Sequence, residues 1–449
     1  LQTATIGTTP QVQAFLEQHN STLLKSGMTL EELLKRPEIL APAGNFEKMT
    51  FAVRYGADAV YGAGKNFGMR AASENFSDEE LVQAVKYCHE RNVKFYVTVN
   101  ILPHENELPA LIEYLTFLEN EAKPDALIVS DMGVFSLAKK YAPHIELHIS
   151  TQSSTVNSEA CKLYASLGAT RVVLAREMTL DEIRTLRENI PEELELEAFV
   201  HGAMCVSYSG RCLLSGFFTG RDANHGKCAQ PCRWEYKESE KTADICEIKR
   251  PDAPLSLVED ARGTYMFSSK DMCMIGHIPE LTEAGINSFK IEGRVKSAYY
   301  TAVTANAYKT ELLKYLADKE HYTFDGKSLY ELESVSHREY ATGFFFDDCS
   351  QNAQITQNGG YLRDKAFLAT VSEIDEKTGR ALLLQRNKAC EGDECELVSP
   401  GKGSVKFTLT DLRNQENEKI DSAPHAKMLY SVKMTVPMKA GDIIRGANR

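Results

Sequence analysis

The strongest constraint on the fold is an alternation of short apolar runs with amphipathic helical segments. Eight such runs lie at 37–44, 57–64, 93–100, 124–131, 146–152, 170–177, 195–202 and 287–294. Near-continuous apolar strands that alternate with helices predict a parallel sheet covered on both faces. Eight units predict a closed (β/α)₈ TIM-like barrel. An open doubly wound sheet is the alternative, but no glycine-rich phosphate fingerprint follows the first run.

The remaining sequence divides into three further parts. The barrel, at 36–318, is expected to follow an N-terminal extension, 1–35, and to carry a cysteine-rich insertion at 203–265. A connecting segment, 319–364, leads to short alternating runs separated by turns such as EKTG at 376–379. Alternating runs joined by such turns indicate hairpins. We therefore predict a small antiparallel β-barrel domain at 365–449.

Composition and charge limit the compartments and the binding partners that we expect for the protein. No apolar run in the 449 residues approaches the ~18 residues of a membrane span, and the first residues lack the pattern of a secretory signal. Eleven cysteines without such a signal favour metal ligands or catalytic groups in a reducing compartment. The net charge of −12 speaks against broad, non-specific nucleic-acid binding. We expect a cytoplasmic protein without membrane attachment.

Several predicted strands end in polar or glycine residues. The carboxyl ends of barrel strands carry the active sites of this architecture, although a polar residue there also serves to cap the following helix. The residues in such positions are Gly44, Asn100, Asp131, Gln152, Arg176, Glu177, His201, Glu292 and Arg294. Of these, Asn100, Gln152 and Arg176 are candidates for substrate binding.

Four cysteines in 28 residues define the predicted insertion. Their spacing is Cys205-x6-Cys212-x15-Cys228-x3-Cys232. Iron–sulfur clusters need about four converging thiolates, whereas structural zinc favours short C-x2–4-C knuckles. Only the last pair has a knuckle spacing, so a cluster facing a substrate cavity is favoured, with zinc or no metal as alternatives. Cys273, further along the chain, is a candidate to replace one ligand.

The segment KIEGRVKS, 290–297, places cations at the end of the last predicted strand. Lys290, Arg294 and Lys296 lie beside Glu292. Terminal strands of barrels often build anion sites, and an arginine there can hold a carboxylate or phosphate with two hydrogen bonds. The alternative is a rim ion pair between Arg294 and Glu292.

Basic and aromatic residues are interleaved around the cysteines. Cations with aromatic rings suit looped or single-stranded RNA, through phosphate contacts and base stacking. The alternative is a solvated loop whose rings pack on the barrel. The residues concerned are Arg211, Arg221, Lys227, Arg233, Tyr208, Phe217, Phe218 and Trp234.

Residues 197–215, EAFVHGAMCVSYSGRCLLS, resemble the signature of the collagenase-like peptidase family of unknown catalytic class. The signature positions are filled by Glu197, Phe199, Gly202, Cys205, Gly210, Cys212 and Ser215. The resemblance extends through 40–71, 148–157, 288–297 and 336–346, which covers most of the chain.

The resemblance implies an activity that the family name does not describe. Its better understood members are similar to oxygen-independent hydroxylases, which act on a tRNA wobble uridine with prephenate as oxygen source, on ribosomal RNA, or on a quinone precursor. Length and the β domain make this chain look most like the branch that forms 5-hydroxyuridine. By resemblance, Cys205 and Cys212 are ligands of an iron–sulfur cluster, most simply [4Fe–4S], that Cys228 and Cys232 complete.

On this interpretation His201, Lys290, Glu292 and Arg294 are catalytic candidates. His201 would relay protons near the cluster, with a satisfied core histidine as the alternative. Arg294, Lys290 and Arg70 would hold prephenate, the small-molecule oxygen donor. The β domain would hold the tRNA partner through Lys402, Lys406 and Arg413.

Two alternatives remain open. A thiol peptidase would pair Cys205 with His201, although the sequence contains neither HExxH nor G-x-S-x-G. A non-catalytic subunit that needs a second family member is the other.

Overall fold

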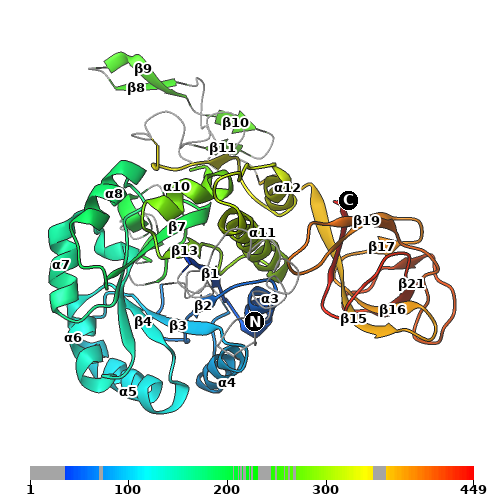
Figure 1. Ribbon diagram of the computed structural model, residues 1–449, viewed down its shortest axis with the longest axis horizontal. Coiled ribbons are helices and arrows are strands. Elements are labelled where there is room, and N and C mark those ends of the chain that lie inside the picture. Colours follow the sequence, from blue (N-terminus) through cyan, green and yellow to red (C-terminus); the bar gives the residue numbers. More distant parts are fainter. Residues whose placement is uncertain are drawn as a thin grey trace.

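The computed structural model describes residues 36–69, 74–205, 207–210, 212, 215, 219–221, 223, 226–230, 244–247, 250–256, 258–260, 263–265, 269–346 and 361–448. Eight parallel strands form its central barrel (Figure 1). They are β1 (Glu38–Pro42), β2 (Ala59–Gly62), β3 (Lys94–Val99), β4 (Ala126–Val129), β5 (Glu146–Ile149), β6 (Arg171–Val173), β7 (Glu195–Ala203) and β13 (Ser288–Ile291). The pairing of β13 with both β1 and β7 closes the barrel. The eight predicted strands and their closure are confirmed.

Helices surround the barrel (Figure 1). They are α3 (Phe46–Arg54), α4 (Asp78–His89), α5 (Leu108–Phe117), α6 (Met132–Tyr141), α7 (Ser158–Ser166), α8 (Leu180–Glu188), α10 (Ile278–Glu283) and α11 (Ala298–Ala317). Local sequence determines where several of these helices begin. Ser77 and Thr179 each form a capping box that satisfies the first amides of α4 and α8. Asp131, a candidate rim residue, caps α6 by accepting a hydrogen bond from the Val134 amide at 2.9 Å.

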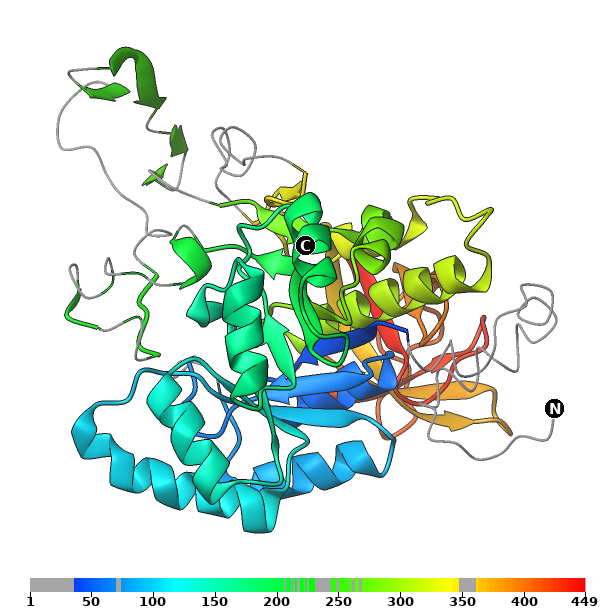
Figure 2. The same cartoon turned by 60° about the vertical axis from the view of Figure 1, so that its left-hand side comes forward.

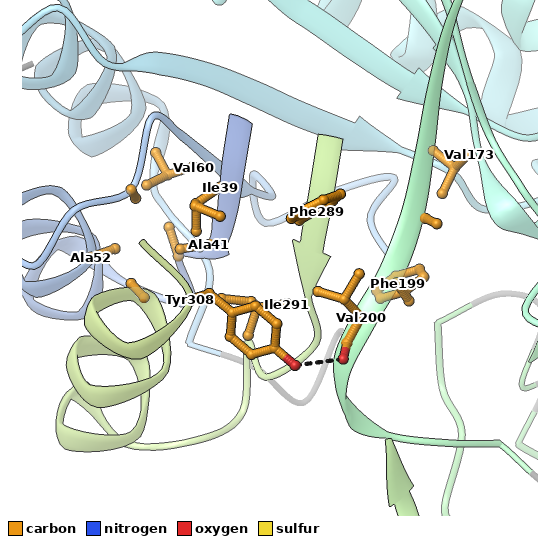
Figure 3. Packing of buried hydrophobic residues seen from close by; sticks show 14 of the residues in the cluster. Ile39, Ala41, Ala52, Val60, Val173, Phe199, Val200, Phe289, Ile291 and Tyr308 are labelled. Atoms are coloured by element: carbon orange, nitrogen blue, oxygen red, sulfur yellow. Dashed lines mark hydrogen bonds between the residues drawn. The ribbon is translucent and has the colours of Figure 1, made fainter. Parts of the chain in front are cut away.

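The space between strands and helices is filled by apolar side chains. Ile39, Val60 and Phe289 pack there, and the Tyr308 hydroxyl of α11 donates to the Val200 carbonyl at 2.7 Å (Figure 3). No helix in the described ranges combines the length and apolarity needed to cross a bilayer.

The interior of the barrel is polar at its base. Arg171 on β6 is 2% exposed and donates to Glu38 on β1 and to Glu195 and Glu197 on β7. Strands β1 and β6 are not neighbours, so these contacts cross the barrel. Buried charges are tolerated only when they are paired and hydrogen-bonded, and Glu38 also accepts from Tyr96 at 2.9 Å.

Two elements extend the sheet beyond the barrel. β12 (Asp271–Cys273) pairs antiparallel with the end of β7, and β14 (Tyr340–Ala341) pairs parallel with β12. The segment that follows the insertion forms β12 and α10. The insertion contributes two short hairpins, one of β8 (Asp244–Glu247) and β9 (Arg250–Ser256), the other of β10 (Val258–Asp260) and β11 (Gly263–Tyr265).

The C-terminal residues form the predicted small antiparallel domain. Its six-stranded sheet has the order β19-β18-β22-β15-β16-β21 and curves into a half-barrel. The strands are β15 (Lys365–Asp375), β16 (Arg380–Gln385), β18 (Glu394–Val398), β19 (Val405–Thr408), β21 (Leu429–Lys433) and β22 (Ile443–Ala447), with a separate pair, β17 (Ala389–Cys390) and β20 (Ser422–Ala423). The EKTG turn joins β15 and β16 as expected.

Helix α11 lies between the barrel and this domain (Figures 1 and 2). It is buried on nearly every face, as expected for a helix enclosed by two layers. Tyr299 of α11 stacks on Phe367 of β15, and Tyr55 donates to the carbonyl of Val398 at 3.0 Å. Arg445, fully buried, forms ion pairs with Glu396 and with Glu331 of α12 (Lys327–Glu333). These contacts fix the β domain beside the barrel mouth.

Candidate active site in the barrel mouth

A cavity of about 850 Å³ occupies the mouth of the barrel at the carboxyl ends of its strands. Nine of the twelve candidate site residues line it. They are Asn100, Gln152, Arg176, Cys205, Cys212, Cys228, Lys290, Glu292 and Arg294. Arg70 and Cys232 lie outside the described residues, and His201 is buried elsewhere. The cavity extends outward to the β domain, which contributes Lys365, Phe367 and Arg386 to its wall.

Lys290 forms part of the cavity floor. Its ammonium is 2.6 Å from Glu197 and lies 4.5 Å from the ring centre of Tyr61. Burial lowers the pKa of Lys290, and the Glu197 carboxylate partly offsets this effect. Burial would raise the pKa of Glu197, but Lys290 and Arg171 together hold it below its usual value. The floor is therefore joined by ion pairs to the charged base of the barrel.

Glu292 and Arg176 lie close to each other in the cavity wall. The Tyr61 hydroxyl lies 3.2 Å from Glu292, and the Arg176 guanidinium is 4.0 Å from the same carboxylate oxygen. Arg176 also stacks on Phe199 at 3.8 Å and donates to the Ala203 carbonyl at 2.9 Å. These contacts hold a carboxylate and a cation side by side, each only about one-eighth exposed.

Arg294 is buried beside the floor, where it donates to the Thr98 hydroxyl at 3.2 Å. The backbone of Arg294 lies in close contact with Gly44. A Cβ atom at Gly44 would collide with the Arg294 carbonyl oxygen. Glycine is thus required where the loop after β1 meets the loop after β13.

Asn100 and Gln152 form one hydrogen-bonded pair in the wall. The Asn100 amide donates to the Gln152 side chain at 2.9 Å and accepts from the Met69 amide at 3.2 Å. The predicted substrate-binding residues that follow β3 and β5 are therefore brought together, and Arg176 lines the same cavity.

The three described cysteines of the predicted metal set line another part of the wall. The Ser207 amide donates to Cys205 Sγ at 3.4 Å, and the Gln230 amide donates to Cys228 Sγ at 3.3 Å. Glu177 positions the first of these loops, since it accepts from both the amide and the hydroxyl of Ser209 at 2.6 Å. Backbone donors to sulfur of this kind tune the sulfur ligands of iron–sulfur clusters.

The thiols share a cavity, but within the described ranges no three histidine, cysteine or acidic side chains gather closely enough to hold a metal ion. The fourth predicted ligand, Cys232, lies in the part of the chain that is not described. Cys273 does not reach the cavity. It is buried in the helix layer, and burial raises its pKa to about 12. The structure therefore does not support Cys273 as a replacement ligand.

His201 lies behind the strand rather than in the cavity. Its ring is 1% exposed and packs against Tyr300, Tyr308 and Tyr340, with centroid distances of 5.4–5.9 Å. Both ring nitrogens are buried without a hydrogen bond to any described residue, and burial lowers the pKa to about 3. This position does not support the predicted role of His201 in proton transfer.

We expect His201 to make the fold sensitive to acid. The unfolded chain binds a proton at this side chain below its usual pKa of 6.5, but the folded chain does so only near 3. Stability is therefore lost as the pH falls through this window, by ~2 kcal/mol between pH 6.5 and pH 5. Urea unfolding of wild type and His201→Phe at pH 7 and pH 5 checks this, because the variant should lack this contribution. Parallel losses in both proteins would contradict it.

The cavity is cationic although the chain is acidic. Its described wall contains three glutamates, Glu47, Glu74 and Glu292, against eight cations, Lys48, Arg176, Lys290, Arg294, Lys296, Arg363, Lys365 and Arg386. The β domain therefore does contribute cations, but not the predicted ones. Lys402, Lys406 and Arg413 do not line the cavity.

The sequence patterns did not identify several of the residues that line the cavity. Tyr61, Lys48, Thr98, Tyr361 and Arg363 had no motif to mark them. Tyr61 and Thr98 lie within predicted strands, where period-2 alternation would have placed them on the inner face. Of the basic and aromatic residues around the cysteines, Tyr208, Arg221 and Lys227 are described but do not line the cavity, and the other five lie outside the described residues.

A peptidase of the cysteine–histidine type finds little support here. No histidine lines the described part of the cavity. Such a peptidase needs its thiol within hydrogen-bond reach of a base, and His201 lies behind strand β7 instead.

Comparison with known proteins places the chain in a family. The model for peptidase family U32 matches residues 44–355, and that for the U32 C-terminal domain matches residues 363–445. A tRNA hydroxylation protein P of Haemophilus influenzae is 36% identical over 424 residues, which cover 86% of this chain and 91% of the relative.

Other relatives bear different names. A collagenase of Porphyromonas gingivalis is 30% identical over 387 residues, with 84% of this chain and 90% of the relative covered. The 23S rRNA 5-hydroxycytidine C2501 synthase of Escherichia coli is 36% identical over 272 residues, with 60% and 38% covered. Because the two family models together span nearly the whole described fold, the chain belongs to peptidase family U32.

Proposed function

We propose that this chain hydroxylates an RNA base, and that its substrate is the wobble uridine of a tRNA, converted into 5-hydroxyuridine without molecular oxygen. The observation that carries this proposal is the cavity in the barrel mouth, with cations on its floor and rim and thiols in its wall. Relatives named for hydroxylation of tRNA and of ribosomal RNA support it. A tRNA substrate also implies that the enzyme acts in the cytoplasm.

The inner cavity suits a small dicarboxylate as the source of the oxygen function, and we propose prephenate. Arg294, Arg176 and Lys290 lie at the floor, and charge-assisted hydrogen bonds from guanidinium groups are the strongest that carboxylates make. Glu292, between Tyr61 and Arg176, is placed to hold or accept a proton beside the bound base. The base would have to leave its stack to enter.

Cys205, Cys212, Cys228 and Cys232 would hold an iron–sulfur cluster, most simply [4Fe–4S]. When bound, it would supply redox chemistry or orient the oxygen donor. The amide donors to Cys205 and Cys228 support this assignment, because they are the contacts that cluster sulfurs receive.

We expect protein purified without oxygen to contain near-stoichiometric iron and acid-labile sulfide. Cys205→Ala and Cys228→Ala should lose both, because each removes one thiolate from the set. Cys390→Ala, a partly exposed cysteine of the β domain, is the matched control and should retain them. Nucleoside analysis of tRNA from a deletion strain, complemented with each variant, then tests the reaction. A colourless protein with one tightly bound zinc ion would refute the cluster, and unchanged tRNA in the deletion strain would refute the substrate.

A further inference from the structure

The outer part of the cavity contains a feature that the proposed hydroxylation does not itself require. Three segments meet there: the loop after β13, the turn before β14, and the strand leading into β15. Lys296 and Arg363 both reach Ser336, since Lys296 Nζ donates to its carbonyl at 3.1 Å and Arg363 Nε donates to its hydroxyl at 3.2 Å. Two positive charges are thus held at one residue on the cavity wall.

Among the described residues, neighbouring carboxylates do not balance the charge of Arg363. Other rim cations are paired, Arg386 with Glu47 and Lys365 with Glu396. Arg363 forms no ion pair with any carboxylate of the described chain. Like charges held close together repel, and an anion that binds both relieves that repulsion. The geometry therefore favours an anionic ligand at this point.

An aromatic ring lies beside Lys296. Lys296 Nζ is 4.3 Å from the ring centre of Tyr361 and 5.3 Å from that of Tyr300. Tyr300 is buried, whereas Tyr361 is 42% exposed and lines the cavity. One face of the Tyr361 ring is on a cation, and part of the ring is exposed beside the cavity. An unpaired base can stack on an exposed ring of this kind.

We propose that Lys296, Tyr361 and Arg363 form a subsite for a nucleotide adjacent to the modified one, with its phosphate on the two cations and its base on Tyr361. This inference rests on the proposed function and deepens it, because it defines the substrate as an unpaired RNA strand that continues from the barrel mouth toward the β domain. A base bound in the inner cavity and a neighbour held at the rim would keep the strand unstacked between them.

The subsite predicts a specific dependence of RNA binding on salt. Binding of a synthetic anticodon stem-loop to the full chain is measured at several salt concentrations. Arg363→Ala should reduce the slope of log affinity against log salt by about 1, because one phosphate contact is lost. Tyr361→Ala should weaken binding about 10-fold, whereas Tyr361→Phe, which keeps the ring, should bind like wild type.

Lys377→Ala and Lys433→Ala are the matched controls, since both lysines are exposed on the β domain but lie outside the cavity. Equal effects from these variants and from Arg363→Ala would overturn the subsite in favour of general attraction by the domain. Unchanged binding in Arg363→Ala and Tyr361→Ala would also overturn it. Free uridine monophosphate competing as strongly as the stem-loop would assign the subsite to a free nucleotide and refute the strand. Failure of the wild type to bind RNA at all would instead refute the proposed function.

Discussion

We expect the Glu197→Gln variant to lose about 3–5 kcal/mol of unfolding free energy, because it leaves buried cations without their counter-charge. Glu197 is fully buried and pairs with Lys290 at 2.6 Å and with Arg171 at 3.1 Å. Its amide replacement keeps the shape and removes the negative charge that both cations face. Urea unfolding at neutral pH measures the loss.

Glu195→Gln is the matched control for this prediction. Glu195 also pairs with Arg171, but its side chain is 42% exposed, so water screens the interaction and the loss should stay within about 1 kcal/mol. The double variant Glu197→Gln/Lys290→Met should recover part of the stability, since one unpaired charge is removed. Equal losses for the two single glutamine variants would show that the barrel base does not depend on this buried pair.

Replacement of Arg294 by methionine should weaken binding of prephenate about 10- to 100-fold. A hydrogen bond to a charged group contributes about 1.5–3 kcal/mol, and Arg294 lies at the floor, where solvent does not screen it. Calorimetric titration of the anaerobic protein with prephenate measures the change. Circular dichroism and the unfolding midpoint report whether the variant retains its fold.

Arg386→Met provides the comparison within the same cavity. Arg386 lines its outer part and is paired with Glu47, so its loss should leave prephenate affinity within about 2-fold of wild type. If Arg294→Met binds prephenate as tightly as wild type does, the oxygen donor is not held at the floor. If wild type does not bind prephenate, the donor itself is wrong.

The relatives are named for different activities, which is consistent with a reaction site formed by residues and loops at the barrel mouth. A barrel scaffold positions residues at strand ends, and different loops there give different reactions. In this chain the conspicuous elements of the mouth are thiols, guanidinium groups and a carboxylate, without a histidine among the described lining residues. The inner cations Arg176 and Arg294 and the rim residues Tyr361 and Arg363 are therefore the positions at which function can be tested most directly.

Much of the fold follows from local sequence. Each strand is a short apolar run that fits a buried parallel sheet. Each helix is marked by the spacing of its apolar residues and often by an N-terminal cap, as at Ser77 and Thr179. Eight successive βα units leave few arrangements other than closure of the last strand on the first. The strand ends could therefore be assigned to one rim, and Lys290, Glu292 and Arg294 were placed correctly in the cavity.

Packing between residues far apart in the sequence decided the position of His201. Regular alternation along β7 would put His201 on the inner face with Glu197 and Phe199, but the register against β13 shifts between Lys290 and Ile291. The His201 ring consequently lies among Tyr300 and Tyr308 of α11 and Tyr340 of β14. A one-residue irregularity reverses the face of a side chain, and no local pattern marks it.

The sequence alone thus determined the barrel, the half-barrel domain, and the grouping of cations and cysteines near one rim, because those features depend on short-range periodicity and on the order of the strands. Only the tertiary structure decided which face His201 occupies and which cations of the β domain reach the mouth. Helix α11 fixes that domain so that Arg363 and Arg386, rather than Lys402, Lys406 or Arg413, line the cavity. The docking of two domains depends on contacts such as Tyr299 with Phe367, between residues far apart in the chain, which local patterns do not encode.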